Sequence, residues 1–243
     1  MIHKALKAFK MLLLGGKPVS AMLRYGVAAA IEHKAVIASL DISTCVDVGA
    51  NVGQFSLLIR NEHPKANIIA FEPLAGPAKT YQKLFADDPQ VEFHQVAIGP
   101  TSETVDMHVS QSIDSSSLLP ISNLQEEQFP GTKEAGHERV TVGPMTDFIS
   151  PDHIRKPALL KIDVQGFELE VLKSAETLLR NFKWVYVEAS FLTLYEGQAL
   201  ADEVIAHLQA RNFRLKGLYS PSYDKHGQAV QADFLFENSS GVA

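Results

Sequence analysis

The residues with the clearest chemical potential form a short glycine-containing segment, 47–53 (DVGANVG). It follows the apolar run Thr44–Val48 and precedes a stretch whose apolar residues recur with helical spacing. Gly49 and Gly53 allow tight turns and close approach of a ligand to the main chain, because neither residue carries a Cβ. The segment is therefore typical of a loop that binds a nucleoside at the carboxyl edge of an open α/β sheet.

The glycine spacing excludes two common phosphate-binding loops. A dinucleotide loop would read G-x-G-x-x-G, and a Walker loop would place Lys-Ser or Lys-Thr after Gly53; neither pattern is present. Asp47 suits a ligand that carries an ammonium group. Glu72 follows the apolar run Asn67–Phe71, where its carboxylate can accept hydrogen bonds from ribose hydroxyls. S-adenosyl-L-methionine (SAM) has an ammonium group, a sulfonium and a ribose, and is the predicted cofactor.

The elements that must position these residues alternate between β-branched runs and helical patterns, which is typical of a parallel sheet. Strands are predicted at Thr44–Val48, Asn67–Phe71, Val91–Val96, Ala158–Ile162 and Lys183–Val187. Helices are predicted at Val52–Asn61, Pro77–Phe85, Phe167–Asn181 and Leu200–Arg211. The last runs, Phe213–Tyr219 and Gln231–Glu237, predict an antiparallel hairpin at the sheet edge. The expected fold is a doubly wound α/β domain.

Several separated blocks of the sequence resemble the FkbM-type SAM-dependent methyltransferases. They are VDVGANVGQFS at 46–56, AFEP at 70–73, VAIG at 96–99, SSSL at 115–118, LLKIDVQGFELEVLKSA at 159–175 and VYVEAS at 185–190. The sequence departs from the family pattern at Gln165, where such proteins often have Glu. The resemblance implies a Rossmann-like class I methyltransferase with a mostly parallel, seven-stranded sheet. It also implies methyl transfer to a hydroxyl, most often of a sugar in a glycan, a glycolipid or a glycosylated natural product.

The resemblance also implies a set of site residues. By this resemblance, the glycine loop would bind the methionyl part of SAM, Glu72 would bind the ribose, and Val96 and Ala97 would contact the edge of the adenine. The full set of predicted cofactor-binding residues is Asp47, Gly49, Asn51, Gly53, Phe55, Glu72, Pro73, Val96, Ala97 and Asp163.

A hydroxyl is a poor nucleophile, so a base that accepts its proton should raise the rate by about 10²–10⁴. The candidates are Asp163, Glu188 and Glu168. Asp163 could instead cap a helix, and Glu168 could stabilise a first helical turn; Glu188 could be a solvated residue at the sheet rim. His108 and His137 are secondary alternatives. No third metal ligand accompanies Asp163 and Glu188, so catalysis is expected to need no metal.

Residues 110–138 have little periodicity and are expected to form a long excursion over the site, although a plain mobile loop is an alternative. Ser116 and Ser117 belong to this segment and are predicted to contact the acceptor; a simple turn is the other interpretation.

Residues 1–31 carry five basic side chains and no acidic one: Lys4, Lys7, Lys10, Lys17 and Arg24. The apolar run Met11–Leu14 is far shorter than the roughly 20 residues that span a bilayer. An amphipathic helix touching an anionic membrane is one interpretation, and a docking helix with a solvated lysine face is the other. Residues 1–40 are expected to form a helical cap on a methyltransferase domain at 41–243. The expected location is the cytoplasm, with peripheral contact at the inner membrane face as the alternative.

The overall composition excludes some functions and leaves others open. The net charge of −6 disfavours a nucleic-acid partner, and the lone Cys45 excludes an intrachain disulfide. Three alternatives to a sugar methyltransferase are a methyltransferase for a small non-sugar metabolite, an NAD(P)-binding reductase, and a catalytically silent SAM-binding scaffold. The oligomeric state is not indicated.

Overall fold

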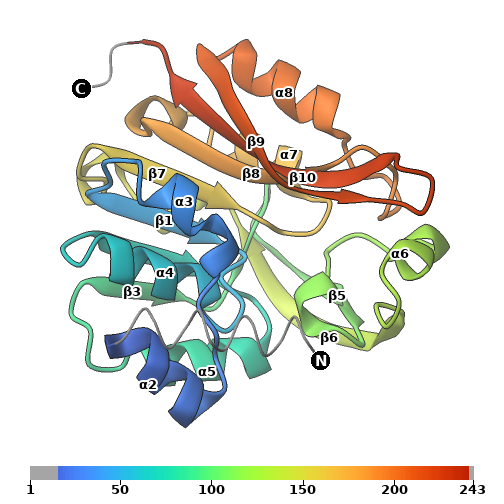
Figure 1. Ribbon diagram of the computed structural model, residues 1–243, viewed down its shortest axis with the longest axis horizontal. Coiled ribbons are helices and arrows are strands. Elements are labelled where there is room, and N and C mark those ends of the chain that lie inside the picture. Colours follow the sequence, from blue (N-terminus) through green and yellow to red (C-terminus); the bar gives the residue numbers. More distant parts are fainter. Residues whose placement is uncertain (1–15, 241–243) are drawn as a thin grey trace.

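The computed structural model describes residues 16–240, which are built around a seven-stranded sheet of order β3-β2-β1-β7-β8-β10-β9 (Figure 1). The strands are β1 Thr44–Val48, β2 Asn67–Phe71, β3 Val91–His94, β7 Ala158–Ile162, β8 Trp184–Ser190, β9 Phe213–Tyr223 and β10 Ala229–Asn238. Strand β10 runs antiparallel to both of its neighbours, β8 and β9, and all other pairs of neighbouring strands in this sheet are parallel. The predicted fold class, a mostly parallel sheet with an antiparallel edge hairpin, is confirmed.

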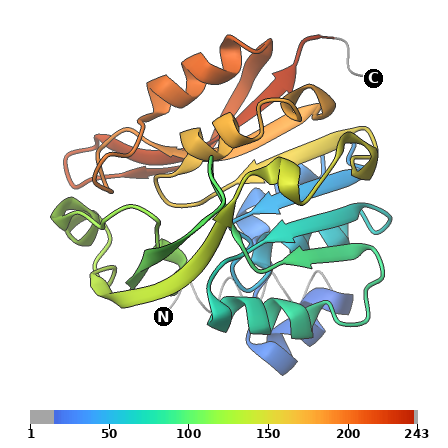
Figure 2. The same ribbon diagram turned by 180° about the vertical axis from the view of Figure 1, so that it is seen from behind.

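The central strands are near-continuously apolar because both faces of the sheet are covered. Every residue of β1 and β7 is buried. Helices α3 Lys34–Ile37, α4 Gln54–Glu62 and α5 Ala75–Leu84 pack on one face. Helices α7 Glu168–Ser174 and α8 Ala201–Gln209 cover the other face, which is turned toward the reader in Figure 2. The molecule is therefore doubly wound, with one apolar core on each side of the sheet.

The register of the central strands aligns their carboxyl ends. Val48 of β1 lies opposite Phe71 of β2 and Ile162 of β7. Since these three residues each end their strand, the next residues of the chain, Gly49 and Glu72 among them, emerge together at one edge of the sheet. Ligands of open α/β sheets bind at this edge.

Apolar spacing predicted one helix over Phe167–Asn181, and the structure divides it. Helix α7 ends at Ser174, and a separate 3₁₀ turn covers Leu179–Asn181. Leu178 and Leu179 remain buried in the same core as the apolar residues of α7. Consecutive turns bury apolar residues with the same spacing as a continuous helix, so periodicity does not distinguish the two.

The predicted excursion at 110–138 and the segment before it contain more regular structure than their composition indicates. Strands β4 Ala97–Ile98, β5 Glu103–Ser110 and β6 Glu134–Gly143 form a second sheet of order β4-β6-β5. Helix α6 Asn123–Gln128 lies between β5 and β6, and Ser122 caps its first turn. Figure 1 shows this part, in green, beyond the carboxyl ends of the central strands. The apolar faces of β5 and β6 pack together with Leu74.

The amino-terminal region adds helices to the face that carries α4. Helix α2 Gly16–Tyr25 contacts α4 and α5, and the 3₁₀ turn η1 Ile31–His33 contacts β9. Residues 1–15, which hold much of the expected basic segment, lie outside the described residues. No helix within residues 16–240 has the length and apolar character to cross a membrane.

Candidate active site

A pocket of ≈ 730 Å³ lies at the carboxyl edge of the central strands, a volume typical of small-molecule sites. The ends of β1, β2, β7 and β8 form one wall, and β5 with the segment that follows it forms the opposite wall. Ten of the predicted residues line it: Gly49, Asn51, Phe55, Glu72, Pro73, Val96, Ala97, Ser116, Asp163 and Glu188.

Glu72 is fixed at the pocket wall by the backbone of two loops. Its Oε2 accepts a hydrogen bond from the Asn51 N–H at 3.0 Å, and its Oε1 accepts one from the Leu74 N–H at 2.8 Å. Burial raises the pKa of Glu72 to about 7, although the two N–H groups oppose this shift. Each carboxylate oxygen keeps a further lone pair for a ligand hydroxyl.

Asn51 presents a polar atom that the protein itself does not satisfy. Its side-chain oxygen is buried and has no hydrogen-bond partner within the described part of the chain. Because an unpaired buried acceptor costs about 1–3 kcal/mol, and Asn51 lines the pocket, this oxygen is suited to a ligand that donates a hydrogen bond.

Gly49 permits the closest approach of two strand ends. Its φ is +79°, and a Cβ at this position would collide with the carbonyl oxygen of Asp163. The Asp163 N–H in turn donates to the Val48 carbonyl at 3.1 Å. The backbone geometry therefore requires glycine here, apart from any contact with a ligand.

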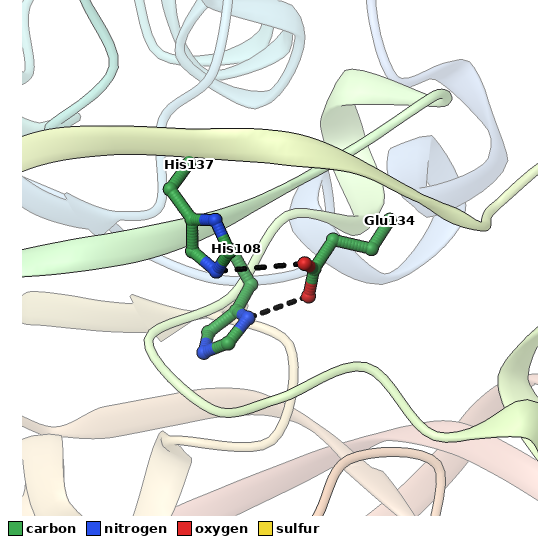
Figure 3. A group of neighbouring side chains, drawn as sticks. All are labelled: His108, Glu134 and His137. Carbon is green, nitrogen blue, oxygen red and sulfur yellow. Dashed lines mark hydrogen bonds and ion pairs between the residues drawn. The ribbon is translucent and has the colours of Figure 1, made fainter.

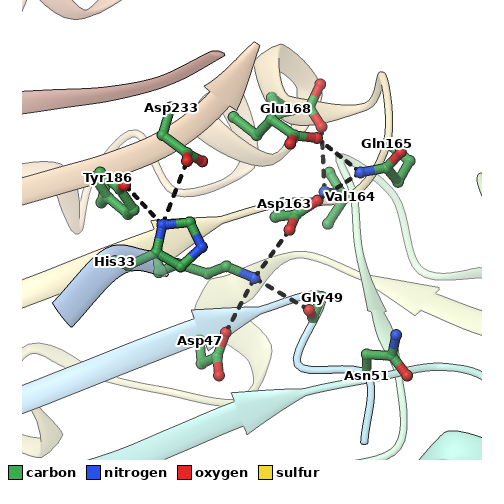
Figure 4. Close-up of polar contacts among 12 residues, drawn as sticks. His33, Asp47, Gly49, Asn51, Asp163, Val164, Gln165, Glu168, Tyr186 and Asp233 are labelled. Atoms are coloured by element: carbon green, nitrogen blue, oxygen red, sulfur yellow. Dashed lines mark hydrogen bonds and ion pairs between the residues drawn. The ribbon is translucent and has the colours of Figure 1, made fainter. Parts of the chain in front are cut away.

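Lys161 was not identified from the sequence, and it is the cation at the floor of the pocket. Its Nζ lies 3.4 Å from Asp47 Oδ1 and 3.6 Å from Asp163 Oδ2, and donates to the Gly49 carbonyl at 3.2 Å. Its three partners, Asp47, Gly49 and Asp163, are labelled in Figure 4. Burial alone would lower the pKa of Lys161, but the surrounding carboxylates outweigh it and raise the pKa. A lysine inside the apolar run 158–162 (ALLKI) was the available signal.

Four predicted residues lie outside the pocket lining: Asp47, Gly53, Glu168 and Ser117. Asp47 is 0% exposed, because its side chain points into the core beneath α4. There its Oδ2 accepts a hydrogen bond from Ser56 Oγ at 2.7 Å. In this structure Asp47 holds Lys161 and α4, and its contact with the cofactor stays a prediction.

The other three residues shape the loops that frame the pocket. Gly53 is the N-cap of α4 and packs against Phe85. Glu168 Oε1 accepts hydrogen bonds from the N–H groups of Val164 and Gly166, at 3.2 and 3.0 Å. Ser117 Oγ donates to the Gln165 carbonyl at 2.6 Å. Glu168, expected as a possible base, therefore orders the loop after β7.

Gln165 joins the two carboxylates that line the pocket. Its Nε2 donates to Asp163 Oδ1 at 2.7 Å and to Glu188 Oε2 at 2.8 Å; the Asp163 contact is visible in Figure 4. Its Oε1 accepts a hydrogen bond from Tyr195 Oη at 2.9 Å. A second amide, Gln231 Nε2, donates to Glu188 Oε1 at 2.9 Å. Three of these four hydrogen bonds join residues that are distant in sequence, and only the bond between Gln165 and Asp163 is local.

Glu188 is the pocket carboxylate with the strongest tendency to hold a proton. Burial raises its pKa well above the usual value, and the charges of Asp163 and Asp233 add to this rise. A carboxylate with a raised pKa accepts a proton more readily while remaining within reach of the pocket. His108 and His137, the secondary alternatives, do not line the pocket.

The amino-terminal region also contributes to the pocket, which the sequence did not indicate. Ala30, Glu32 and His33 line it. His33 Nδ1 lies 2.9 Å from Tyr186 Oη and 3.4 Å from Asp233 Oδ2, as Figure 4 shows. These contacts attach the segment before β1 to strands β8 and β10.

Comparison with known proteins gives one family and several relatives. The methyltransferase FkbM domain matches residues 47–215. Methyltransferase 1 of Beauveria bassiana is 27% identical over 56% of this chain and 59% of the relative. The 2-O-methyltransferase NoeI of Sinorhizobium fredii is 26% identical over 68% of this chain and 72% of the relative. The hexuronic acid methyltransferase AglP of Haloferax volcanii is 27% identical over 58% of this chain and 54% of the relative. The chain thus spans little more than half the length of two of these three proteins.

Proposed function

The chain belongs to the methyltransferase FkbM domain family, and from this premise we propose that it is a SAM-dependent O-methyltransferase whose acceptor is a sugar hydroxyl. The observation that carries the proposal is the pair Asp163 and Glu188, bridged by Gln165 in the same pocket as Glu72. The names of two relatives, a 2-O-methyltransferase and a hexuronic acid methyltransferase, support an acceptor of the sugar class.

The pocket residues fit the proposed cofactor. Glu72 would accept hydrogen bonds from the ribose hydroxyls, and the apolar Val96 and Ala97 would flank the adenine. The unpaired oxygen of Asn51 would accept a hydrogen bond from the ligand. Lys161 and Asp163 offer opposite charges to the carboxylate and ammonium of the methionyl part. SAM, when bound, supplies an electrophilic methyl group on a positively charged sulfur.

A side chain of the protein would then remove the proton of the acceptor hydroxyl. As the hydroxyl oxygen formed its bond to the methyl group, the bond from that methyl group to sulfur would break and leave its electron pair on sulfur. The hydroxyl proton would pass to the carboxylate of Glu188. Gln165 and Gln231 hold this carboxylate through one oxygen each, which fixes its orientation before the acceptor arrives. Positioning of the hydroxyl and removal of its proton are the two contributions that we assign to the chain.

The wall opposite the sheet is mixed and offers polar groups to an acceptor. Its polar lining residues are Ser112, Asp114, Ser116, Gln125, Gln128 and Thr132, and its apolar ones are Met107, Ile113, Leu118, Phe129 and Pro130. Gln125 is only 2% exposed, and its side-chain oxygen has no hydrogen-bond partner among residues 16–240. A sugar carries several hydroxyls, so one could donate to this oxygen while another is methylated, whereas a simple alcohol has only the hydroxyl that reacts.

Transfer of labelled methyl groups from SAM to a panel of acceptors tests the proposal. The panel contains neutral hexosides, hexuronates, and aliphatic and phenolic alcohols without a sugar. We expect turnover on a sugar. Glu188→Gln should lower kcat by about 10²–10⁴ and leave the affinity for S-adenosylhomocysteine unchanged. Glu170→Gln is the matched control, because Glu170 pairs with Lys173 at the surface and does not line the pocket.

The other outcomes distinguish the alternatives. A folded protein that does not bind S-adenosylhomocysteine would contradict the whole proposal, and NADH would be titrated next. Binding without turnover on any acceptor would favour the silent scaffold. Turnover confined to alcohols without a sugar would favour a small-metabolite methyltransferase.

We also propose that the amino-terminal region contacts anionic membranes peripherally. Helix α2 exposes Met22, Leu23 and Tyr25 beside Arg24, and Leu23 is 80% exposed. An exposed apolar residue next to basic ones is suited to the interface of an anionic bilayer.

A further inference from the structure

Three side chains converge on the outer face of the small sheet. His108 of β5 and His137 and Glu134 of β6 are shown in Figure 3. His108 Nδ1 lies 2.6 Å from Glu134 Oε2, and His137 Nε2 lies 3.4 Å from Glu134 Oε1. One potential ligand atom from each residue lies within 4.8 Å of the other two. None of the three residues lines the large pocket.

The register of the two strands produces this convergence. His108 and His137 are directly opposite each other in the antiparallel pair β5–β6. Residues three apart in a regular strand point to opposite faces, so Glu134 and His137 would normally be separated. The register shifts between Val109 and Ser110, which places Glu134 opposite Ser110. This bulge brings the carboxylate to the face of the two imidazoles, as bulges commonly re-aim side chains.

Two imidazoles and one carboxylate form a ligand set typical of zinc sites that keep an open position. We propose that His108, Glu134 and His137 bind one zinc-class divalent cation. Ligand atoms around tetrahedral zinc lie about 3.3 Å apart, so small side-chain rotations would close the set. The side chains are 19%, 37% and 48% exposed, in the order His108, Glu134, His137, and an ion can therefore enter from solvent.

The ion would connect to the pocket through the backbone of His108. The N–H and carbonyl of His108 bond to the carbonyl and N–H of Ser117, at 2.9 and 3.0 Å. Ser117 Oγ in turn donates to the Gln165 carbonyl. A cation that ties β5 to β6 would thus stabilise the strand beside the pocket wall. This role does not depend on which reaction the pocket performs.

Titration of the tag-free, metal-stripped full chain with Zn²⁺, in competition with a chromophoric chelator, tests the site. We expect one Zn²⁺ per chain in the wild type. Glu134→Gln and His137→Gln should each weaken the affinity at least about tenfold, the scale of losses at metal sites. His153→Gln is the matched control, because His153 is exposed in a separate 3₁₀ turn, and its affinity should equal that of the wild type.

Thermal unfolding gives an independent measurement. Zn²⁺ should raise Tm of the wild type and of His153→Gln, and should leave Tm of Glu134→Gln unchanged. Failure of the wild type to bind at 100-fold excess of Zn²⁺ over protein would overturn the proposal. Equal affinities of wild type and Glu134→Gln would overturn it as well, because the three residues would then be only a hydrogen-bonded cluster.

Discussion

At the scale of single residues, buried carboxylic acids with raised pKa values lie in and beside the pocket. Burial raises the pKa of Glu72 and of Glu168 to about 7, and that of Glu188 also rises. Lys161 lies among these acids and pairs with Asp47 and Asp163. Since Asp47 is 0% exposed, loss of the lysine would leave a buried carboxylate without its counter-charge, which is strongly destabilising.

Glu168→Gln should remove a pH dependence of stability. The pKa of Glu168 is raised in the folded state, so the folded chain binds more protons than the unfolded chain between about pH 4.5 and 7. Stability from this group is present at low pH and is lost as the pH rises through 7. The loss is on the order of 3 kcal/mol. Glutamine cannot titrate, yet its Oε1 can still accept the hydrogen bonds from Val164 and Gly166.

Urea unfolding at pH 5 and pH 8 measures this effect. The wild type should lose more unfolding free energy over this interval than Glu168→Gln does. The surface variant Glu170→Gln should follow the wild type. If the pH slopes of wild type and Glu168→Gln were parallel, Glu168 would not be the titrating group.

At the scale of elements, the in-phase ends of β1, β2 and β7 create the binding edge. Their last residues are paired in register, so the loops that follow must pass close to one another. The tightest approach is between Gly49 and the carbonyl of Asp163. The same strand ends carry the groups proposed to bind the cofactor. Both the packing of the loops and the binding of the cofactor therefore require these strand ends to stay in register.

Gly49→Ala should destabilise the fold by about 2–4 kcal/mol, since a positive φ costs 1–3 kcal/mol and a clash with backbone adds to it. Gly227→Ala is the control. Gly227 also has a positive φ, +84°, but a Cβ there would meet nothing within 4 Å. The control should lose only about 1 kcal/mol. Urea midpoints give both values, and equal losses would show that the contact with Asp163 does not matter.

At the scale of the whole molecule, the pocket is completed by parts outside the main sheet. The segment around η1 supplies His33 on one side, and the small sheet with α6 supplies Ser116 and Gln125 on the other. The same amino-terminal region carries α2 with its exposed Leu23. The membrane contact proposed for the amino-terminal region would be made by this helix.

Vesicle flotation tests this membrane contact. Full-length protein should float with phosphatidylglycerol-containing vesicles and not with neutral ones. Leu23→Asp should reduce flotation several-fold, because it replaces an exposed apolar contact with a charge that anionic lipid repels. Leu218→Asp alters another exposed leucine, 45% exposed on β9, and should float like the wild type. Equal flotation of the two variants would exclude α2 as the contact.

The sequence by itself determined the elements that are specified locally. Apolar runs bounded by polar or glycine residues gave β1, β2 and β7 with their observed bounds. The glycine loop and Glu72 were located because each directly follows such a run. The strand β5 was not predicted, although Val105 and Val109 alternate with polar residues. The start of β6 fell inside the predicted excursion at 110–138, whose polar composition suggested a loop.

Only the tertiary structure decided which side chains meet. Lys161 belongs to an apolar strand, and its pairing with Asp47 exists because β1 and β7 are neighbours in the sheet. Gln165 reaches Glu188 across two strand ends, and His33 reaches Tyr186 from the other end of the chain. Local sequence patterns indicate which residues are buried and where the chain turns, whereas these contacts depend on the order and register of the strands. The site residues that the sequence missed are those whose partners lie far away along the chain.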